Sequence, residues 1–280
     1  PLKCKFTLNG LNLTSTKGAA IDIQCGKRVD LILPDGTQNV LEDAAGGLQK
    51  AALYCKGHLE IEGGGSLTVS GNTRHAIASK EYMQLKKSTG NIVIKKAVGD
   101  AVHMGQYLLM NGGSITFDEN TACDGIQVET MLLNDNITPD PSKEENGKIF
   151  INGGSINGVI AHEDYEGIKN DDGDVFISGG TIRILANGNG SRGIQTDGNM
   201  TITADAGNTN IYVEANGGLC TDPADSVDPH RCMGIKVGQN LTITGGTIQV
   251  KATGNKARQI RVNGVYSNTG GTVDAIISQP

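Results

Sequence analysis

Short stretches in which apolar and polar residues alternate recur along the whole chain, and they predict β-strands. In Ile235–Val237, Leu241–Ile243 and Ile248–Val250 every second residue is aliphatic, which is the period of a strand with one buried face. The aliphatic residues stand at odd positions before the pair Gly245-Gly246 and at even positions after it. A straight strand through this point would turn its buried face outward, so the glycine pair predicts a corner.

The same pattern returns at a nearly constant interval. A glycine doublet followed by Ser or Thr and then an aliphatic residue occurs six times, beginning at Gly64, Gly112, Gly153, Gly179, Gly245 and Gly270. A second marker, typically a small residue followed by an aliphatic one, ends at Leu53, Ile77, Val102, Ile126, Ile168, Ile194, Ile235 and Ile260. Five of the seven intervals between these markers are 24–26 residues long, and the other two are 42 and 41. One unit of about three short strands cannot bury its own apolar face, but stacked units can.

The pattern therefore predicts an all-β fold, a single-stranded parallel β-helix of about nine coils. We expect one domain over residues 1–280, in which residues 1–50 form N-terminal capping coils. Leucine-rich repeats need a leucine-dense consensus that is absent here, and propeller blades need ~40–50 residues per repeat. The two long intervals carry polar, turn-rich insertions at 134–147 and 216–232. Such loops either carry binding or are tolerated surface excursions.

Composition narrows the possible partners. The chain has 40 Gly, no Trp, 4 Phe and 6 Tyr, and a formal net charge of -6. The negative charge argues against nucleic acid as a partner, and no apolar run approaches the ~18–20 residues of a membrane-spanning helix. The scarcity of aromatic residues argues against a flat aromatic strip for crystalline polysaccharide, but binding of a charged polysaccharide through basic side chains and bridging cations stays compatible with it. We expect a monomer that is secreted, periplasmic or on the cell surface, with its signal or lipoprotein anchor removed before Pro1.

The cysteines allow one disulfide across the second insertion. Cys220 and Cys232 flank this loop, and closing it in an oxidising compartment would contribute roughly 3 kcal/mol. The sequence contains no Cys-x-x-Cys pair, so a zinc or redox site has no support. The remaining cysteines are expected to be small buried residues of the stack, and they are Cys4, Cys25, Cys55 and Cys123.

Stacking would convert the repeat into columns of side chains about 4.8 Å apart. Two residues before each marker, the column reads His75, Asp100, Asp124, Glu166, Arg192, Met233 and Arg258. Three carboxylates on consecutive rungs would repel one another by roughly 3 kcal/mol per pair at an effective dielectric of ~20. A cation, a raised pKa or exposure to water must relieve this repulsion. Oxygen ligands suit Ca²⁺, whereas the alternative is a solvated acidic face compensated by Lys169 and Arg192.

The neighbouring columns add polar groups to this candidate site. The groups in question are His103, Glu129, Lys169, Asp171 and Asp197. The run Asn170–Asp174 contains Asp-Gly, which predicts a tight turn, with a calcium contact through Asp171 as the alternative. A basic row beside the acidic residues supplies candidate substrate-binding groups, and it consists of Lys169, Arg192, Lys236 and Arg261. The sequence has no nucleophile elbow, zinc-protease motif or phosphate-binding loop.

Four segments resemble a bacterial family of extracellular β-helical carbohydrate-binding domains. The segments are Gly99-Asp100-Ala101-Val102-His103, Asn111-Gly112-Gly113-Ser114-Ile115, Tyr165-Glu166-Gly167-Ile168 and Ile177-Ser178-Gly179-Gly180-Thr181-Ile182. The resemblance covers roughly residues 50–265 and implies a right-handed β-helix related to family 9 pectate lyases, with bound calcium and with binding of polygalacturonate and cellulose. It also implies metal positions at Asp100, His103, Asp124 and Glu166. The chain departs from the family at the 216–232 loop and at Arg192, where a further acidic residue is expected.

Three functional hypotheses follow from these observations. The first is a non-catalytic protein that binds an acidic polysaccharide with the help of Ca²⁺. The second is a calcium-dependent pectate lyase, which would use Lys169 as the base of a β-elimination. The third is a structural cell-surface adhesin, in which the columns are solvated faces.

Overall fold

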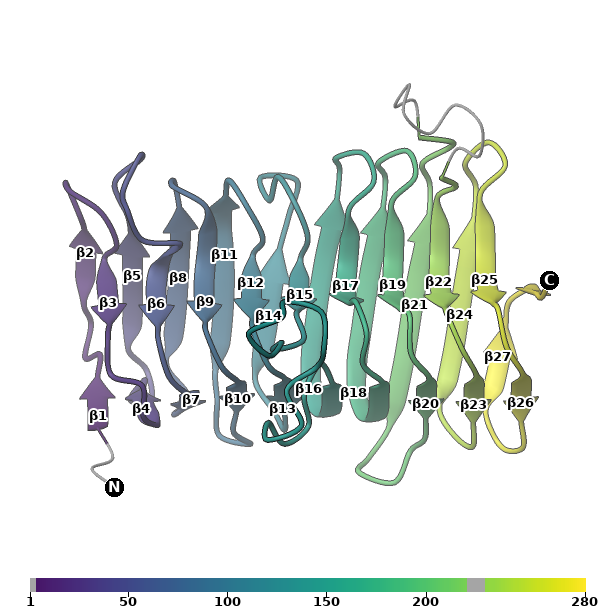
Figure 1. The fold of residues 1–280 in the computed structure, drawn as a ribbon, viewed down its shortest axis with the longest axis horizontal. Helices are drawn as coiled ribbons and strands as arrows, with labels where there is room; N and C mark the ends of the chain where they lie inside the picture. Colours follow the sequence, from purple (N-terminus) through teal and green to yellow (C-terminus); the bar gives the residue numbers. More distant parts are fainter. Residues whose placement is uncertain (1–3, 221–229) are drawn as a thin grey trace.

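The computed structural model describes residues 4–220 and 230–280, and these residues form strands without any helix. The strands stack in parallel as a solenoid of about ten turns, each with three strand positions, which confirms the predicted fold class (Figure 1). Within the described ranges no segment forms a helix capable of crossing a bilayer.

One row of strands faces the viewer in Figure 1 and is called the front sheet below. Its ten strands are β3 (Ile21–Ile23), β6 (Ala51–Cys55), β9 (His75–Ser79), β12 (Val102–Met104), β15 (Ile126–Val128), β17 (Glu166–Asn170), β19 (Arg192–Thr196), β22 (Met233–Val237), β25 (Arg258–Val262) and β28 (Ile277–Ser278).

The other two rows are joined into one sheet by two long strands, β16 (Ile149–Ile160) and β18 (Val175–Ala186). The first row also contains β1 (Cys4–Thr7), β4 (Val29–Ile32), β7 (Leu59–Glu62), β10 (Met83–Leu85), β13 (Leu108–Met110), β20 (Met200–Ile202), β23 (Leu241–Ile243) and β26 (Tyr266–Asn268). The second row also contains β2 (Asn12–Thr14), β5 (Gln38–Glu42), β8 (Ser66–Gly71), β11 (Asn91–Ala97), β14 (Ser114–Phe117), β21 (Thr209–Ala215), β24 (Thr247–Ala252) and β27 (Thr272–Asp274).

The register of the front sheet is the one that the marker residues predict. All eight markers, from Leu53 to Ile260, pair with one another in sequence order, and all are buried. The column continues to Ile21 at one end and to Ile277 at the other, so the stack has ten rungs where about nine were expected. The strands of the first fifty residues pair with later strands of all three rows, so the N-terminal coils belong to the same stack.

The glycine doublets lie at corners, as the change of apolar phase predicts. In β16 and β18 the ladder shifts register near the doublets, and Gly154 and Gly180 adopt φ values of 85° and 93°. A side chain at Gly154 would also collide with the previous rung, because its Cβ would lie 2.4 Å from the carbonyl oxygen of Gly113. Both the backbone conformation and the close stacking therefore require glycine here.

The small residue that precedes every marker except Ile260 is explained by close packing inside the coil. A Cβ on Gly125 would lie 2.2 Å from Cζ of Phe117, and a Cβ on Gly167 would lie 2.6 Å from Cγ2 of Ile184. Phe117 and Ile184 are buried residues of the second row. The small residue thus leaves room for core side chains that pack across the coil, which explains why it accompanies the buried marker.

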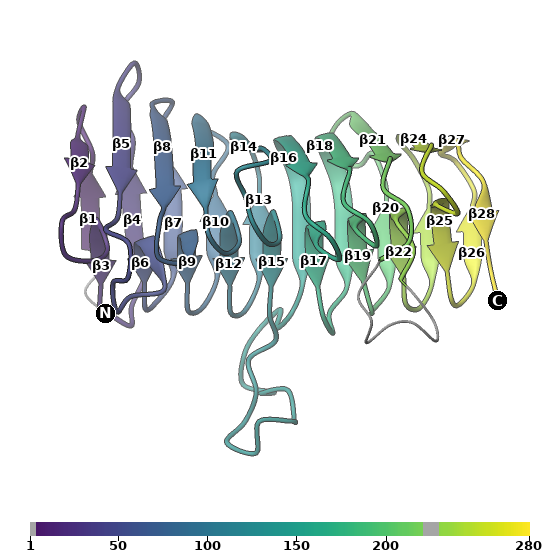
Figure 2. The ribbon, with the colours of Figure 1, turned by 90° about the horizontal axis from the view of Figure 1, so that it is seen from above.

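The two insertions leave the stack at different corners. The first connects β15 to β16 and projects away on the side of the front sheet (Figure 2). The second connects β21 to β22, and its residues 221–229 lie outside the described ranges. The run Asn170–Asp174 connects β17 to β18, as the predicted turn requires.

The register of the second insertion does not suit the expected disulfide. Its two ends pair as an antiparallel bridge between Leu219 and Arg231, so Cys220 lies opposite His230 while Cys232 lies two residues further on. Diagonal neighbours of this kind are typically ~7–8 Å apart, beyond the usual Cα separation in a disulfide. The structure accordingly carries Cys232 as a thiol, whose Sγ lies 3.4 Å from the carbonyl oxygen of Ala186.

The remaining cysteines only partly match their expected role as small buried residues. Cys55 is buried, whereas Cys4 and Cys123 are half-buried and Cys25 is exposed. Burial raises the pKa of the Cys55 thiol to about 11. Of these cysteines, Cys55 alone is enclosed as a core residue of the stack.

Candidate functional site

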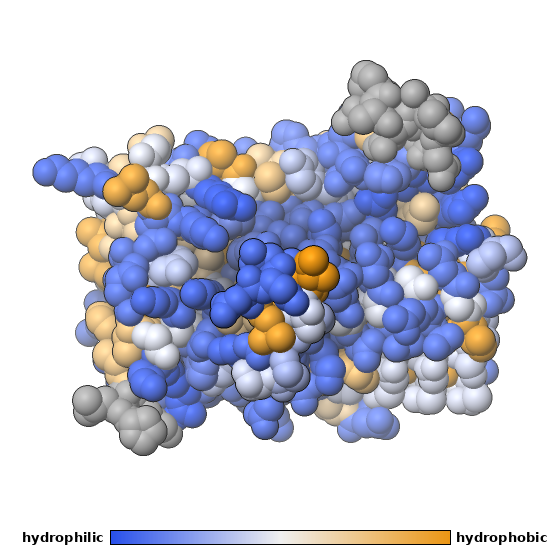
Figure 3. Space-filling model, viewed as in Figure 1, coloured by the Kyte–Doolittle hydropathy of each residue, from blue (hydrophilic) through white to orange (hydrophobic). Residues whose placement is uncertain are grey.

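The front sheet presents polar side chains in two columns, and Figure 3 shows a largely hydrophilic surface over its middle strands. The first, here called the outer column, lies one residue after each marker and reads Asp22, Tyr54, Ala78, His103, Gln127, Lys169, Gln195, Lys236, Arg261 and Ser278. The second, here called the corner column, lies two residues before each marker and contains His75, Asp100, Asp124, Glu166 and Arg192.

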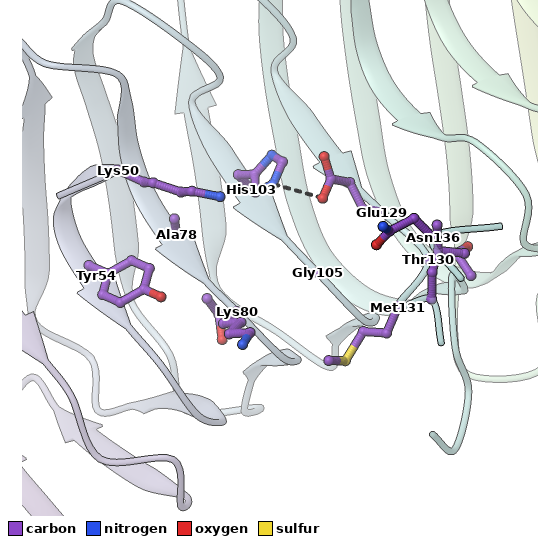
Figure 4. Close-up of a pocket in the computed structure, with 12 residues that line it drawn as sticks. Lys50, Tyr54, Ala78, Lys80, His103, Gly105, Glu129, Thr130, Met131 and Asn136 are labelled. Carbon is purple, nitrogen blue, oxygen red and sulfur yellow. Dashed lines mark ion pairs between the residues drawn. The ribbon is translucent and has the colours of Figure 1, made fainter. Parts of the chain in front are cut away.

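A pocket of about 560 Å³ lies between the front sheet and the first insertion. Figure 4 shows Lys50, Tyr54 and Lys80 on one side of it, with Lys50 reaching toward His103. Three further lining residues come from the other side, where the insertion begins, and they are Thr130, Met131 and Asn136. The pocket therefore combines cationic side chains, an aromatic ring and loop residues around one open space.

His103 is held in this pocket by carboxylates on two sides. Its Nδ1 lies 2.8 Å from Oδ2 of Asp100, and its Nε2 lies 3.5 Å from Oε2 of Glu129. Although burial opposes the charge, the hydrogen bond to Asp100, followed by that to Glu129, raises the pKa of His103 to about 9. His103 is thus an imidazolium at neutral pH, and Glu129, whose side chain is half exposed, is its outer counterion.

Asp100 contacts two stacked histidine rings, with its Oδ2 3.1 Å from Nδ1 of His75 and 2.8 Å from Nδ1 of His103. The rings of His75 and His103 stack with their centroids 4.3 Å apart, and the backbone N–H of Asp100 donates to Nδ1 of His75 at 3.0 Å. Burial alone would raise the pKa of Asp100, but the hydrogen bond with His103 holds it well below its usual range. The pKa of His75 is lowered, mainly by burial. These three residues form the one cluster with metal-ligand character found among the described residues, with ligand atoms within 4.8 Å of one another.

The corner column is linked from rung to rung by backbone hydrogen bonds. The N–H of Asp124 donates to Oδ1 of Asp100 at 3.2 Å, and the N–H of Glu166 donates to Oδ1 of Asp124 at 2.7 Å. All three acidic residues are at most 4% exposed, so the alternative of a solvated acidic face is wrong. The charge compensation by Lys169 and Arg192 that this alternative also predicts is present in the structure.

Arg192 neutralises the far end of this acidic column. Its Nη1 donates hydrogen bonds to Oε1 of Glu166 and to Oδ1 of Asp164, the latter at 3.1 Å. The same Asp164 oxygen also lies 2.9 Å from Nδ1 of His230. Because the Arg192 side chain is 7% exposed, its guanidinium belongs to the interior of the site and is not presented to a ligand, in contrast to the expected substrate-binding role.

Lys169 lies at the centre of the remaining carboxylates. Its Nζ is 3.6 Å from Oδ2 of Asp124, 3.7 Å from Oε2 of Glu166 and 3.7 Å from Oδ1 of Asp171. Burial opposes the ammonium, but these carboxylates, Asp124 first, raise its pKa above the usual value. Burial, with the charge of Glu166, raises the pKa of Asp124 to about 8.

The five residues predicted to bind calcium do not form one calcium site in this arrangement. Asp100 and His103 pair with each other at one end, whereas Asp124, Glu166 and Asp171 surround Lys169 at the other. A Ca²⁺ ion needs six to eight oxygen ligands at about 2.3–2.6 Å, and the ammonium group lies in the space that these oxygens share. The residues present therefore do not fit the ion at the position that the sequence predicts.

The remaining basic residues lie along the outer column. Lys236 and Arg261 are paired on adjacent strands, and Gln195 separates Lys236 from Lys169. Lys236 lies 3.9 Å from Oδ1 of Asp197, and Nε of Arg261 donates to Oδ1 of Asn263 at 3.1 Å. Both side chains remain partly exposed, so this row extends away from the pocket as a cationic strip.

Sequence reasoning missed three residues of the pocket, Lys50, Tyr54 and Lys80. Each holds a fixed place relative to a marker. Lys50 lies three residues before Leu53 and Tyr54 one residue after it, and Lys80 lies three residues after Ile77. Extending the columns to these rungs would have found them. The signal was present in the repeat, but the acidic rungs alone were used to place the site.

Comparison with known proteins identifies the family. The family described as "Carbohydrate-binding domain-containing protein" matches residues 2–279. A curated relative of the same description from Acetivibrio thermocellus is 35% identical over 98 residues, which are 32% of this chain and 34% of the relative. A solved structure, a gadolinium derivative of the polysaccharide lyase-like protein from C. thermocellum, is similar with a TM-score of 0.60 and 25% identity, over 75% of this chain and 78% of that chain. The chain belongs to the family of carbohydrate-binding domain-containing proteins.

Proposed function

We propose that the protein binds an acidic polysaccharide on its front sheet, with the pocket beside the first insertion as the principal subsite. The observation that carries this proposal is the convergence of Lys50 and Lys80 on one open pocket of about 560 Å³, where the charge of His103 is already balanced by Asp100 and Glu129. Two lysines around such a space suit a ligand that carries carboxylates, and the ring of Tyr54 offers an apolar surface to a sugar. An extracellular or cell-surface location would give the protein access to such polymers.

The outer column supports a ligand longer than one sugar. Lys236 and Arg261 continue the cationic surface along the sheet, on rungs about 4.8 Å apart. A polymer lying across the strands would meet one side chain per rung. This proposal assigns the positive charge to side chains of the protein and not to the calcium ion that the sequence predicts.

The second candidate function is polysaccharide cleavage by β-elimination, which the similarity to a polysaccharide lyase-like structure brings into consideration. A base for that reaction must be unprotonated when it removes the proton. Lys169, the predicted base, is an ammonium whose pKa is raised by three carboxylates. We therefore expect no growth of near-ultraviolet absorbance from unsaturated products on polygalacturonate with calcium, and such growth would favour the lyase.

Affinity gel electrophoresis with and without polygalacturonate tests the proposal. We expect the polymer to retard the wild-type protein and the double variant K50A/K80A to lose about tenfold in affinity, or ~1.4 kcal/mol. The matched control is K87A/K95A, which removes the same charge from exposed lysines outside the front sheet. Equal retardation of the two double variants would reject the pocket as the subsite. Equal mobility of the wild type across a panel of acidic and neutral polymers would favour a structural adhesin.

A further inference from the structure

The acidic corner column raises a question that polysaccharide binding does not answer. Asp124 and Glu166 are 3% and 2% exposed on adjacent rungs, and Asp171 joins them from the following turn. Buried carboxylates this close to one another need a cation, a shared proton, or both. The identity of that cation determines whether the site depends on a metal.

Both carboxylate oxygens of Glu166 are already engaged by basic side chains of the protein. Oε1 accepts from Arg192, and Oε2 lies 3.7 Å from Nζ of Lys169. The same Nζ approaches Asp124 and Asp171 at 3.6 and 3.7 Å. One ammonium is therefore shared by three carboxylates that come from different rungs and from a turn.

The opposite end of the column offers no free oxygen to the same centre. Oδ2 of Asp100 is used by His103 and Oδ1 accepts the N–H of Asp124. Oδ1 of Asp164, which could extend an oxygen cluster, is held by Arg192. A divalent ion would thus have to displace Lys169 to find ligands here.

We infer that Lys169 and Arg192 are built-in cations that replace a divalent metal in the corner column. The converse also follows: removing the Lys169 charge leaves Asp124, Glu166 and Asp171 as a cluster of oxygen ligands that takes up a divalent cation of the calcium type. This inference is independent of polysaccharide binding, because it concerns only the internal charge balance of the stack.

Thermal unfolding and calorimetric titration with calcium chloride, each compared with EDTA, test the inference. The wild-type protein is expected to show the same melting temperature in both media and no heat of binding. The K169M variant is expected to melt several degrees lower than wild type in EDTA, and to recover most of that difference in millimolar calcium. Calcium should act on K169M as a ligand that binds only the folded state.

The matched control is K236M, which removes a lysine of the same outer column two rungs away, whose Nζ lies 3.9 Å from Oδ1 of Asp197. Its melting temperature should lie within a degree or two of that of the wild type and should be the same in calcium and in EDTA. The triple variant K169M/D124N/D171N should lose the calcium response, which assigns the ligands.

Two results would overturn the inference. The first is a wild-type protein that binds calcium stoichiometrically and melts lower in EDTA. The second is a folded K169M variant whose melting temperature calcium does not change. Should K169M fail to fold, the wild-type titration alone still supports or overturns the metal-independent state.

Discussion

Replacing Arg192 with methionine should destabilise the protein strongly, because it removes one partner of a buried ion pair. The Arg192 and Glu166 side chains are 7% and 2% exposed, so the carboxylate left behind cannot gain water. Breaking such a pair typically costs about 3–5 kcal/mol. Oε2 of Glu166 keeps Lys169 at 3.7 Å, so we expect the lower end of this range, about 3 kcal/mol. At roughly 2–4 °C per kcal/mol, the melting temperature should fall by about 6–12 °C.

The assay is thermal unfolding followed by circular dichroism, and its control is R261M. Arg261 is a partly exposed arginine of the front sheet whose Nε donates a hydrogen bond to Oδ1 of Asn263. Its replacement should change the free energy of unfolding by less than about 1 kcal/mol. The double variant E166Q/R192M should be more stable than R192M, because it removes the uncompensated charge together with its partner. An R192M protein as stable as R261M, or a double variant that simply adds the two losses, would refute the buried-pair reasoning.

Three further predictions concern packing and pH. G125A should lower the free energy of unfolding by about 1–3 kcal/mol, because its Cβ would lie 2.2 Å from Phe117. Adding F117L should restore part of this stability. An unchanged melting temperature of G125A would contradict the prediction. The hydrogen bond to Asp100 overcomes burial and raises the pKa of His103 to about 9. The protonated His103 therefore stabilises the fold fully below about pH 6.5, and this stabilisation disappears as pH rises through 9. H103Q should lack this decline, and parallel pH profiles of melting temperature for H103Q and wild type would refute the prediction. Burial raises the pKa of Asp124 to about 8. Its proton therefore stabilises the fold fully below about pH 4, and this stabilisation is lost as pH rises through 8. The free energy of unfolding of D124N should rise relative to that of wild type between pH 5 and 8, whereas a difference that does not change with pH would contradict this.

The register of the fold could be predicted from sequence because two separate physical requirements mark each rung. A glycine such as Gly154 is needed at the corner for its positive φ, and one such as Gly125 is needed before the marker to make room for Phe117. Each requirement constrains one position of the backbone, and at Gly154 and Gly125 it leaves no room for a side chain. Such local constraints are visible in a single sequence, and they place Asp124 and Glu166 on adjacent rungs before any coordinates are known.

The pairing of side chains could not be predicted in the same way. A column places Lys169 beside Glu166, but it does not say whether the lysine turns outward to a polysaccharide or inward to the carboxylates. Four rotatable bonds separate Nζ from the backbone, and the choice depends on the summed attraction of Asp124, Glu166 and Asp171. The expected disulfide depends on the same kind of detail, because flanking a loop does not ensure that Cys220 and Cys232 lie directly opposite each other.

The burial of the acidic column follows from the geometry of stacking itself. On the surface of an ordinary globular domain, a charged side chain has water on most sides. In a β-helix each side chain has neighbours about 4.8 Å above and below it, so only its tip can reach solvent. Once Lys169 and Arg192 cover the tips of Asp124 and Glu166, these carboxylates are enclosed, although they lie on the outer side of the sheet. An acidic column in the middle of a solenoid must therefore be neutralised by groups within the stack, and in this chain the basic residues one column and one rung away meet that requirement.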